Sequence, residues 1–287
     1  MSDINAALVG KLREKSGARL MDCKKALTET QAEFGGKGDA PWIEAAESWL
    51  RKKNISTSEK MTEKGAQEGL LGHKVAGNAI TVVEMTANTD FVAKNEEFRK
   101  LLASLVDLAD ANKVDSLEKL NALSLNGVPV PEAVKLLAGK IGENITVKRV
   151  VRIEGEFGYY IHFDDKQGAI VEIGGATGEK AQAIGKDIAM HIVFAKPNCL
   201  TRDEVSPDLI KKETDIATER LKSDPKNANK PPEIMAKIVS GQVNKFYSTL
   251  VLPDQAYYKE GAKTVAQVLK DQNATVKRFV RFEVGAV

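Results

Sequence analysis

The sequence has few of the side chains on which most enzyme chemistry depends. Its 287 residues include only two cysteines, Cys23 and Cys199, and three histidines, His73, His162 and His191. Two cysteines so far apart exclude a disulfide framework and a paired-cysteine metal site. No histidine has a second metal ligand three or four positions away, so no metal is expected. No serine lies in a nucleophile-elbow pattern, and hydrolytic and redox catalysis therefore lack a candidate set of residues.

The sequence also lacks the signals of membrane insertion, of secretion and of a dedicated nucleic-acid binder. No apolar run reaches the roughly 20 residues that cross a bilayer, and residues 1–4 do not begin a signal peptide. Basic and acidic residues nearly balance, with 42 against 40 and a net charge of +2. Nucleic-acid-binding domains usually carry a clear basic excess. We therefore expect a soluble protein of the bacterial cytoplasm.

The N-terminal residues have the pattern of a small helical bundle. Apolar side chains repeat every fourth position in residues 4–15, and a second short helix is predicted over residues 20–28. Asp39 is predicted to be the N-cap residue of a third helix. Residues 52–58 have the polar composition of a linker, so we predict an N-terminal domain of residues 1–54.

The remainder of the chain contains an internal repeat. Asn144–Glu154 recurs as Asn273–Glu283, with eight of eleven positions identical. Chance similarity between strands is the alternative, but alternation of polar and apolar residues predicts residue class rather than identity. Strand hairpins are also predicted over residues 69–86 and 159–173. These patterns predict an α+β fold with two related subdomains, each a small antiparallel sheet with helices: residues 55–155 and 156–287.

The second subdomain contains an interruption from about residue 208 to residue 250. The pattern there is helical on both sides of Ser223–Asn227. It predicts an antiparallel helical hairpin inserted into the second subdomain.

Two glycine-rich segments superficially resemble phosphate-binding loops. Gly174–Lys180 and Gly35–Gly38 both lack the spacing of a Walker motif. We predict that both are plain turns. The sequence thus gives the chain no means of binding a nucleotide directly.

The segment Thr89–Asn95 is the strongest candidate for a functional loop, because it lies between a predicted buried strand and a strong amphipathic helix. Thr89 or Asp90 could cap the turn that follows and thereby orient Phe91. Spacing alone favours Phe91 as a core aromatic residue. The alternative is an exposed anchor that fills a pocket on a partner, and the pattern leaves both interpretations open.

Several segments, in order along nearly the whole chain, resemble the elongation factor Ts family. The matching segments are Leu12–Ala18, Met21–Leu27, Thr89–Asn95, Lys140–Ile145, Ala189–Ile192 and Arg281–Gly285. The resemblance implies an N-terminal three-helix domain like a ubiquitin-associated domain, followed by two related α+β subdomains. It implies that the helical hairpin projects from the second of them.

The resemblance also implies a guanine nucleotide exchange factor of translation elongation, without covalent chemistry and without a cofactor. In the family, the segment corresponding to Thr89, Asp90, Phe91 and Val92 enters the GTP-binding domain of elongation factor Tu and dislodges its Mg²⁺. That ion requires near-ideal octahedral coordination, so small displacements weaken its binding. GDP then leaves faster.

Other partner contacts are implied by the same resemblance. Arg13, Leu20, Met21 and His191 correspond to positions that grip the GTP-binding domain. Tyr258 corresponds to a contact with another domain of elongation factor Tu. The expected partner is elongation factor Tu in its GDP-bound and nucleotide-free states, and a two-to-two assembly is a further expectation.

Two other classes of function remain open at this point. The N-terminal bundle could serve an adaptor that binds a helix or peptide. Lys148, Arg149 and Arg152, with their repeats, could bind RNA, although a solvated sheet face is the commoner meaning of such a pattern. Release of labelled GDP from elongation factor Tu separates these possibilities.

Overall fold

The computed structural model describes residues 4–16, 18–61, 67–223 and 230–286, with the backbone only for 54–61. Its contacts divide the chain into two units. The first runs to Arg152 and includes the end of the chain from Val284, and the second is Ile153–Glu283. Each unit contains a three-stranded sheet and several helices, so the predicted α+β class is confirmed. The boundaries of the three predicted domains stay predictions.

The first unit begins with the three-helix bundle that the apolar periodicity predicts. Its helices are α1 (Ala6–Ser16), α2 (Leu20–Phe34) and α3 (Asp39–Met61). Leu12, Cys23 and Trp42 are buried among them. The Trp42 indole N–H donates to the Leu27 carbonyl (3.2 Å) and to the Thr30 hydroxyl (3.1 Å), which satisfies the one polar group of this buried ring.

The prediction of a linker over residues 52–58 is wrong, because α3 continues through them to Met61. The segment contains neither glycine nor proline, and its lysines favour a helix. Polar composition therefore did not indicate an irregular backbone here.

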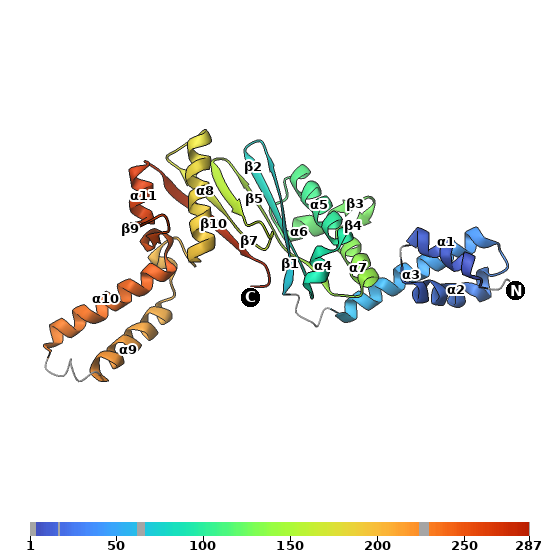
Figure 1. Cartoon of the computed structure of the whole chain (residues 1–287), viewed down its shortest axis with the longest axis horizontal. Helices are drawn as coiled ribbons and strands as arrows, with labels where there is room; N and C mark the ends of the chain where they lie inside the picture. The colour runs from blue at the N-terminus through green and yellow to red at the C-terminus, as the bar shows by residue number, and fades with distance from the viewer. Residues whose placement is uncertain (1–3, 17, 62–66, 224–229, 287) are drawn as a thin grey trace. The chain divides into compact units, whose positions relative to one another are not determined.

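The sheet of the first unit is built on the predicted hairpin. Strands β1 (Glu68–Ala76) and β2 (Ala79–Ala87) are antiparallel, and β5 (Ile145–Glu154) lies next to β2. Gly77 has a φ of +59°, which suits the two-residue turn between Ala76 and Ala79. In Figure 1 the helices that lie between β2 and β5 in the sequence gather beside this sheet. The remaining elements of the unit are α4 (Asp90–Lys94), α5 (Glu96–Ala111), α6 (Leu117–Asn121), β3 (Ser124–Leu125), β4 (Val128–Pro129) and α7 (Val130–Ile141).

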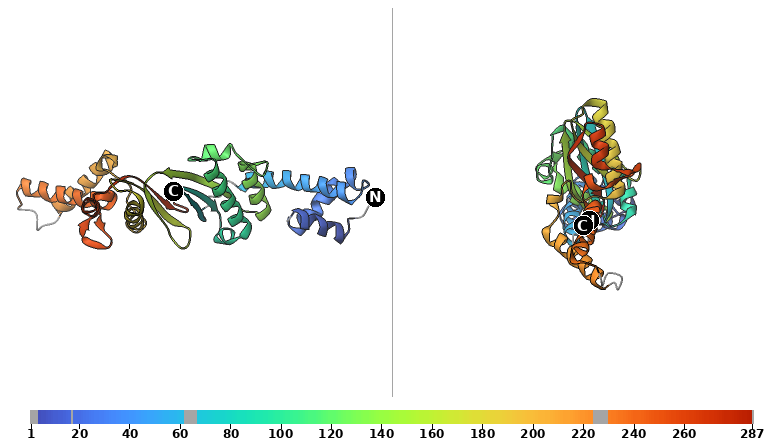
Figure 2. Two further views of the ribbon diagram at one scale, coloured as in Figure 1. Left: turned by 90° about the horizontal axis from the view of Figure 1, so that it is seen from above. Right: turned by 90° about the vertical axis from the view of Figure 1, so that its left-hand side faces the viewer.

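The sheet of the second unit repeats the arrangement of the first. A hairpin of β6 (Phe157–Ile161) and β7 (Gln167–Gly174) is followed by β10 (Thr275–Glu283), which lies next to β7. The repeated sequence thus forms the third strand in both units. Helix α8 (Gly178–Ala195) packs against β6 and β7 (Figures 1 and 2). The smaller elements are two 3-10 turns (Arg202–Glu204, Leu252–Asp254), β8 (Ala256–Tyr257), β9 (Glu260–Thr264) and α11 (Val265–Asp271).

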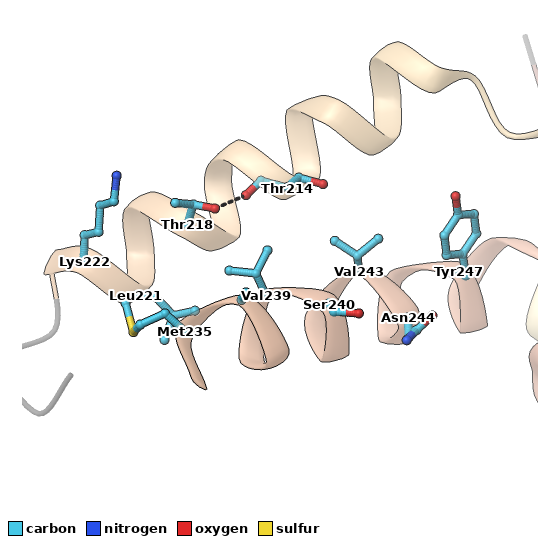
Figure 3. A pocket seen from close by; sticks show the side chains of 11 residues that line it. Thr214, Thr218, Leu221, Lys222, Met235, Val239, Ser240, Val243, Asn244 and Tyr247 are labelled. Carbon is cyan, nitrogen blue, oxygen red and sulfur yellow. Dashed lines mark hydrogen bonds between the residues drawn. The ribbon is translucent and has the colours of Figure 1, made fainter. Parts of the chain in front are cut away.

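The predicted helical hairpin consists of α9 (Pro207–Ser223) and α10 (Pro232–Leu250), packed side by side. The turn predicted at 223–227 lies, apart from Ser223, outside the described residues. Figure 3 shows a groove between the two helices, into which Val239 and Val243 of α10 point. No residue of α10 is fully buried, so its apolar face stays partly open to solvent.

Candidate interaction site

The candidate functional segment lies at the junction between β2 and α5. The sequence predicts a loop there, but Asp90–Lys94 forms a short helix, α4. Val92 and Ala93 are buried in the core of the first unit, and they anchor this turn.

Phe91 points away from that core. Its side chain is 79% exposed, so the interpretation of Phe91 as a core aromatic residue is wrong. Successive residues of a helix are rotated by about 100°. Burial of Val92 and Ala93 on one side of the turn therefore turns Phe91 outward. An aromatic ring held outward by a buried anchor is suited to a pocket on a partner.

An ion pair lies next to the exposed ring. The Lys94 ammonium lies 2.8 Å from the Asp90 carboxylate and 6.0 Å from the centroid of the Phe91 ring. Both charged groups are exposed, so this pair adds little to stability. It places one acidic and one basic group beside an apolar anchor, available to a partner.

The residues that flank α4 both use their side chains in hydrogen bonds outside this helix. Asn95 caps α5, since its Oδ1 accepts hydrogen bonds from the backbone N–H groups of Glu97 (2.8 Å) and Phe98 (3.4 Å). Thr89 is the N-cap residue of α4, but its side chain makes no capping bond. Its hydroxyl donates instead to the Glu143 carboxylate, at 2.9 and 3.1 Å. Thr89 therefore has a role that the sequence did not predict.

The basic residues considered for RNA binding are largely engaged within the first unit. The Arg152 guanidinium lies 2.7 Å from the Asp110 carboxylate, and both side chains are nearly buried. Arg149 pairs at 2.6 Å with Glu84, a buried carboxylate. Arg152 has thus lost the exposed guanidinium that phosphate recognition requires, and Arg149, although 36% exposed, already has an acidic partner.

Comparisons with known proteins connect this geometry to a family. The sequence model of the family described as Elongation factor TS matches residues 88–286. An elongation factor Ts of Deinococcus deserti is 41% identical over 97% of this chain and 98% of its own length. The elongation factor Ts of Pseudoalteromonas atlantica is 39% identical over 98% of this chain and 91% of its own. The chain belongs to the elongation factor Ts family. That membership gives it a role in translation elongation.

Three residues that the resemblance to elongation factor Ts singled out lie on the N-terminal bundle. Leu20 and Met21 begin α2 and are exposed, as is Arg13 on α1. Exposure of two large apolar side chains beside each other is costly in water unless a partner covers them. The three residues therefore have the accessibility that their predicted role requires.

His191, the next predicted contact, is fully buried in the second unit. Its Nδ1 accepts from the backbone N–H of Tyr258 (3.3 Å), and its Nε2–H donates to Gln255 Oε1 (2.9 Å). Burial lowers the pKa of His191, while the bond to Gln255 partly opposes that change. Neutral His191 thus holds Tyr258, the remaining predicted contact, rather than facing solvent.

Phe194 is an exposed aromatic residue that the sequence analysis missed. It lies on α8, and its ring centroid is 6.4 Å from that of the half-buried Tyr258. The two rings form a small aromatic surface on the second unit. Spacing gave no signal for its exposure, because Phe194 follows the fully buried His191 by three residues and residues at that spacing are neighbours on a helix.

Within the described residues, no group of three or more His, Cys, Asp or Glu side chains is arranged to hold a metal ion. Among the helices in that part of the chain, none is both long and apolar enough to cross a membrane.

Proposed function

We propose that the chain is a guanine nucleotide exchange factor that acts on elongation factor Tu. The observation that supports this most directly is the exposed Phe91 ring on a turn anchored by Val92 and Ala93. In the proposed complex, Thr89–Val92 enters the GTP-binding domain of the partner. The ring then fills space beside the partner's Mg²⁺ site.

The effect on the nucleotide follows from the coordination of Mg²⁺. This ion demands near-ideal octahedral geometry, so displacement of its ligands by a small distance weakens its binding. Loss of the ion leaves the β-phosphate of GDP less neutralised, and GDP dissociates faster. No covalent step and no nucleotide bound by this chain are needed.

Recycling of the factor follows from thermodynamic linkage. If the chain weakens GDP binding by some factor, GDP must weaken binding of the chain by the same factor. Rebinding of nucleotide therefore releases the chain from its partner. The proposed cycle passes through the GDP-bound and nucleotide-free partner.

Further contacts would orient the complex. We propose that Arg13, Leu20 and Met21 bind the same domain of elongation factor Tu as Phe91. Tyr258 would bind another domain, with His191 acting through Tyr258 because the imidazole is buried. The open apolar face of α10 is compatible with a two-to-two assembly, which stays a prediction.

The rival functions have less support. An RNA-binding role for Arg149 and Arg152 conflicts with their ion pairs to Glu84 and Asp110. An adaptor role for the bundle does not explain why Phe91 points outward.

Release of labelled GDP from purified elongation factor Tu tests the proposal. We expect the chain to accelerate release and Phe91→Ala to lower the maximal stimulation at least about tenfold, as for the loss of an aromatic hot spot. The variant should melt like the parent, because exposed substitutions rarely change stability by more than about 0.5 kcal/mol.

Phe163→Ala is the matched control, since Phe163 is 89% exposed in the second unit and should keep full stimulation. A spontaneous rate that the parent chain leaves unchanged would exclude exchange activity. Full stimulation by a folded Phe91→Ala variant would remove Phe91 from the mechanism.

A further inference from the structure

Thr89 uses its side chain in an unusual way for a residue at the start of a helix. An N-cap threonine ordinarily accepts a hydrogen bond from a backbone N–H of the first turn. Thr89 makes no such bond. Its hydroxyl reaches both oxygens of Glu143, a residue 54 positions later in the chain. The start of α4 has therefore exchanged a local cap for a tertiary contact.

The position of Glu143 is set by the end of α7. Gly142 follows the helix with a φ of +84°, a left-handed conformation that glycine adopts without strain. Its N–H donates to the Ala138 carbonyl (2.7 Å), which closes the helix. The next residue is Glu143, and Asn144 and Ile145 are then buried at the start of β5. The carboxylate thus extends from a well-anchored turn.

A second contact joins the same end of α7 to the far side of α4. The Lys140 ammonium lies 2.7 Å from the Glu97 carboxylate, in the first turn of α5. Glu97 is largely exposed, so this ion pair is weak. The bond between Thr89 and Glu143 is half-buried and involves an ionised acceptor, which makes it the stronger of the two.

We propose that Glu143 is a positioning residue for Phe91, an inference that rests on the proposed exchange function. Glu143 fixes Thr89, and Thr89 is only two residues from Phe91. With the bond in place, the turn presents the ring in one direction before the partner arrives. Without it, α4 keeps its buried anchors Val92 and Ala93 but loses its hold at Thr89. The cost of ordering the turn then falls on the step in which the ring enters the partner.

The test measures GDP release from elongation factor Tu as the concentration of this protein is varied. We expect Glu143→Ala and Thr89→Val each to lower the maximal stimulated rate about tenfold, the effect of one charge-assisted hydrogen bond. Thr89→Val keeps the size of the side chain and carries the test if Glu143→Ala does not fold. Glu143→Gln and Thr89→Ser retain an acceptor and a donor and should restore most of the rate.

The Phe91→Ala background separates positioning from a general structural role. A residue that acts through Phe91 has nothing left to position there, so adding Glu143→Ala to Phe91→Ala should cause no further loss. Glu97→Ala is the matched control, because it removes a neighbouring carboxylate at an exposed pair, and it should change the rate less than twofold.

Two results would overturn the inference while leaving the proposed function intact. One is normal stimulation by Glu143→Ala and Thr89→Val while Phe91→Ala is impaired. The other is an additional tenfold loss when Glu143→Ala is combined with Phe91→Ala. Normal stimulation by Phe91→Ala itself would instead remove the role of Phe91, and the inference with it.

Discussion

The helices that cover the two sheets approach them at different distances. In the second unit, Gly185 of α8 meets Gly158 of β6, and a Cβ added to Gly185 would lie 2.5 Å from the Gly158 nitrogen. In the first unit, large side chains of α5 stand between helix and sheet. A Cβ added to Gly72 of β1 would meet the side chains of Leu102 and Val106, each at 2.8 Å.

The strand-to-helix junctions differ as well. In the second unit β7 ends at Gly174, and Gly175, with a φ of +77°, begins a short turn into α8. In the first unit the chain inserts α4 between β2 and α5 and turns Phe91 outward. The two units therefore share a scaffold, and the candidate site is an addition to one of the two junctions. This comparison teaches that the repeated sequence specifies the third strand of each sheet, while the candidate site lies in a connection that is not repeated.

Replacing the repeated arginine should lower the free energy of unfolding more in the first unit than in the second, and this is the largest of the expected effects. Arg152 is paired with Asp110, with both side chains at most 10% exposed, whereas its counterpart Arg281 pairs with the more exposed Glu283. We expect Arg152→Ala to lower the free energy of unfolding by about 3 kcal/mol or somewhat more, because the nearly buried Asp110 carboxylate then keeps, among the described residues, only the longer contact with the Lys74 ammonium (3.6 Å) and the Thr81 hydroxyl. Arg281→Ala should cost about 1 kcal/mol or less. Urea denaturation of both variants measures this, and equal losses would show that the two arginines are equivalent.

Replacing the glycine at the contact between helix and sheet should give the next largest change in stability. We expect Gly185→Ala to destabilise the protein by about 3 kcal/mol, since backbone atoms of Gly158 cannot move aside. This exceeds the gain of about 1 kcal/mol from replacing a glycine within a helix. Gly72→Ala should cost only about 1 kcal/mol, because side chains can shift to admit the new methyl group. Thermal melting compares the two variants, and a milder effect at Gly185 would contradict the backbone contact.

Lowering the pH should destabilise the second unit more than the first, although this is the smallest of the expected effects. Burial lowers the pKa of His191 in the folded state, so on acidification the unfolded chain takes up a proton first, near its ordinary pKa of about 6.5. Stability should be fully present above that pH and decline as the pH falls below it. His191→Gln should flatten the dependence of melting temperature on pH between about 5 and 7.

His73→Gln is the comparison for this experiment, because it removes an exposed histidine of the first unit and leaves His191 in place. A His191→Gln variant with the full pH dependence would assign the effect to another group.

Much of the scaffold could be predicted from local patterns. Alternation of apolar residues predicted both hairpins, and the repeat of Asn144–Glu154 predicted two related sheets. Periods of about four residues predicted the bundle and the paired helices α9 and α10. The prediction failed where composition replaced periodicity, as at residues 52–58, and where one turn was too short to show a period, as at α4. These failures lie at the connections between elements.

The sequence by itself determined the class of fold, the order of the elements and the family, because these depend on patterns within short segments. Only the tertiary structure decided which side chains face solvent and which partners they take. The outward direction of Phe91 depends on Val92 and Ala93 finding a core, and that of Thr89 on a carboxylate 54 residues away. Arg152 likewise meets Asp110 across 42 positions of sequence. Such contacts join residues that no local pattern relates, so they exist only once the chain has folded.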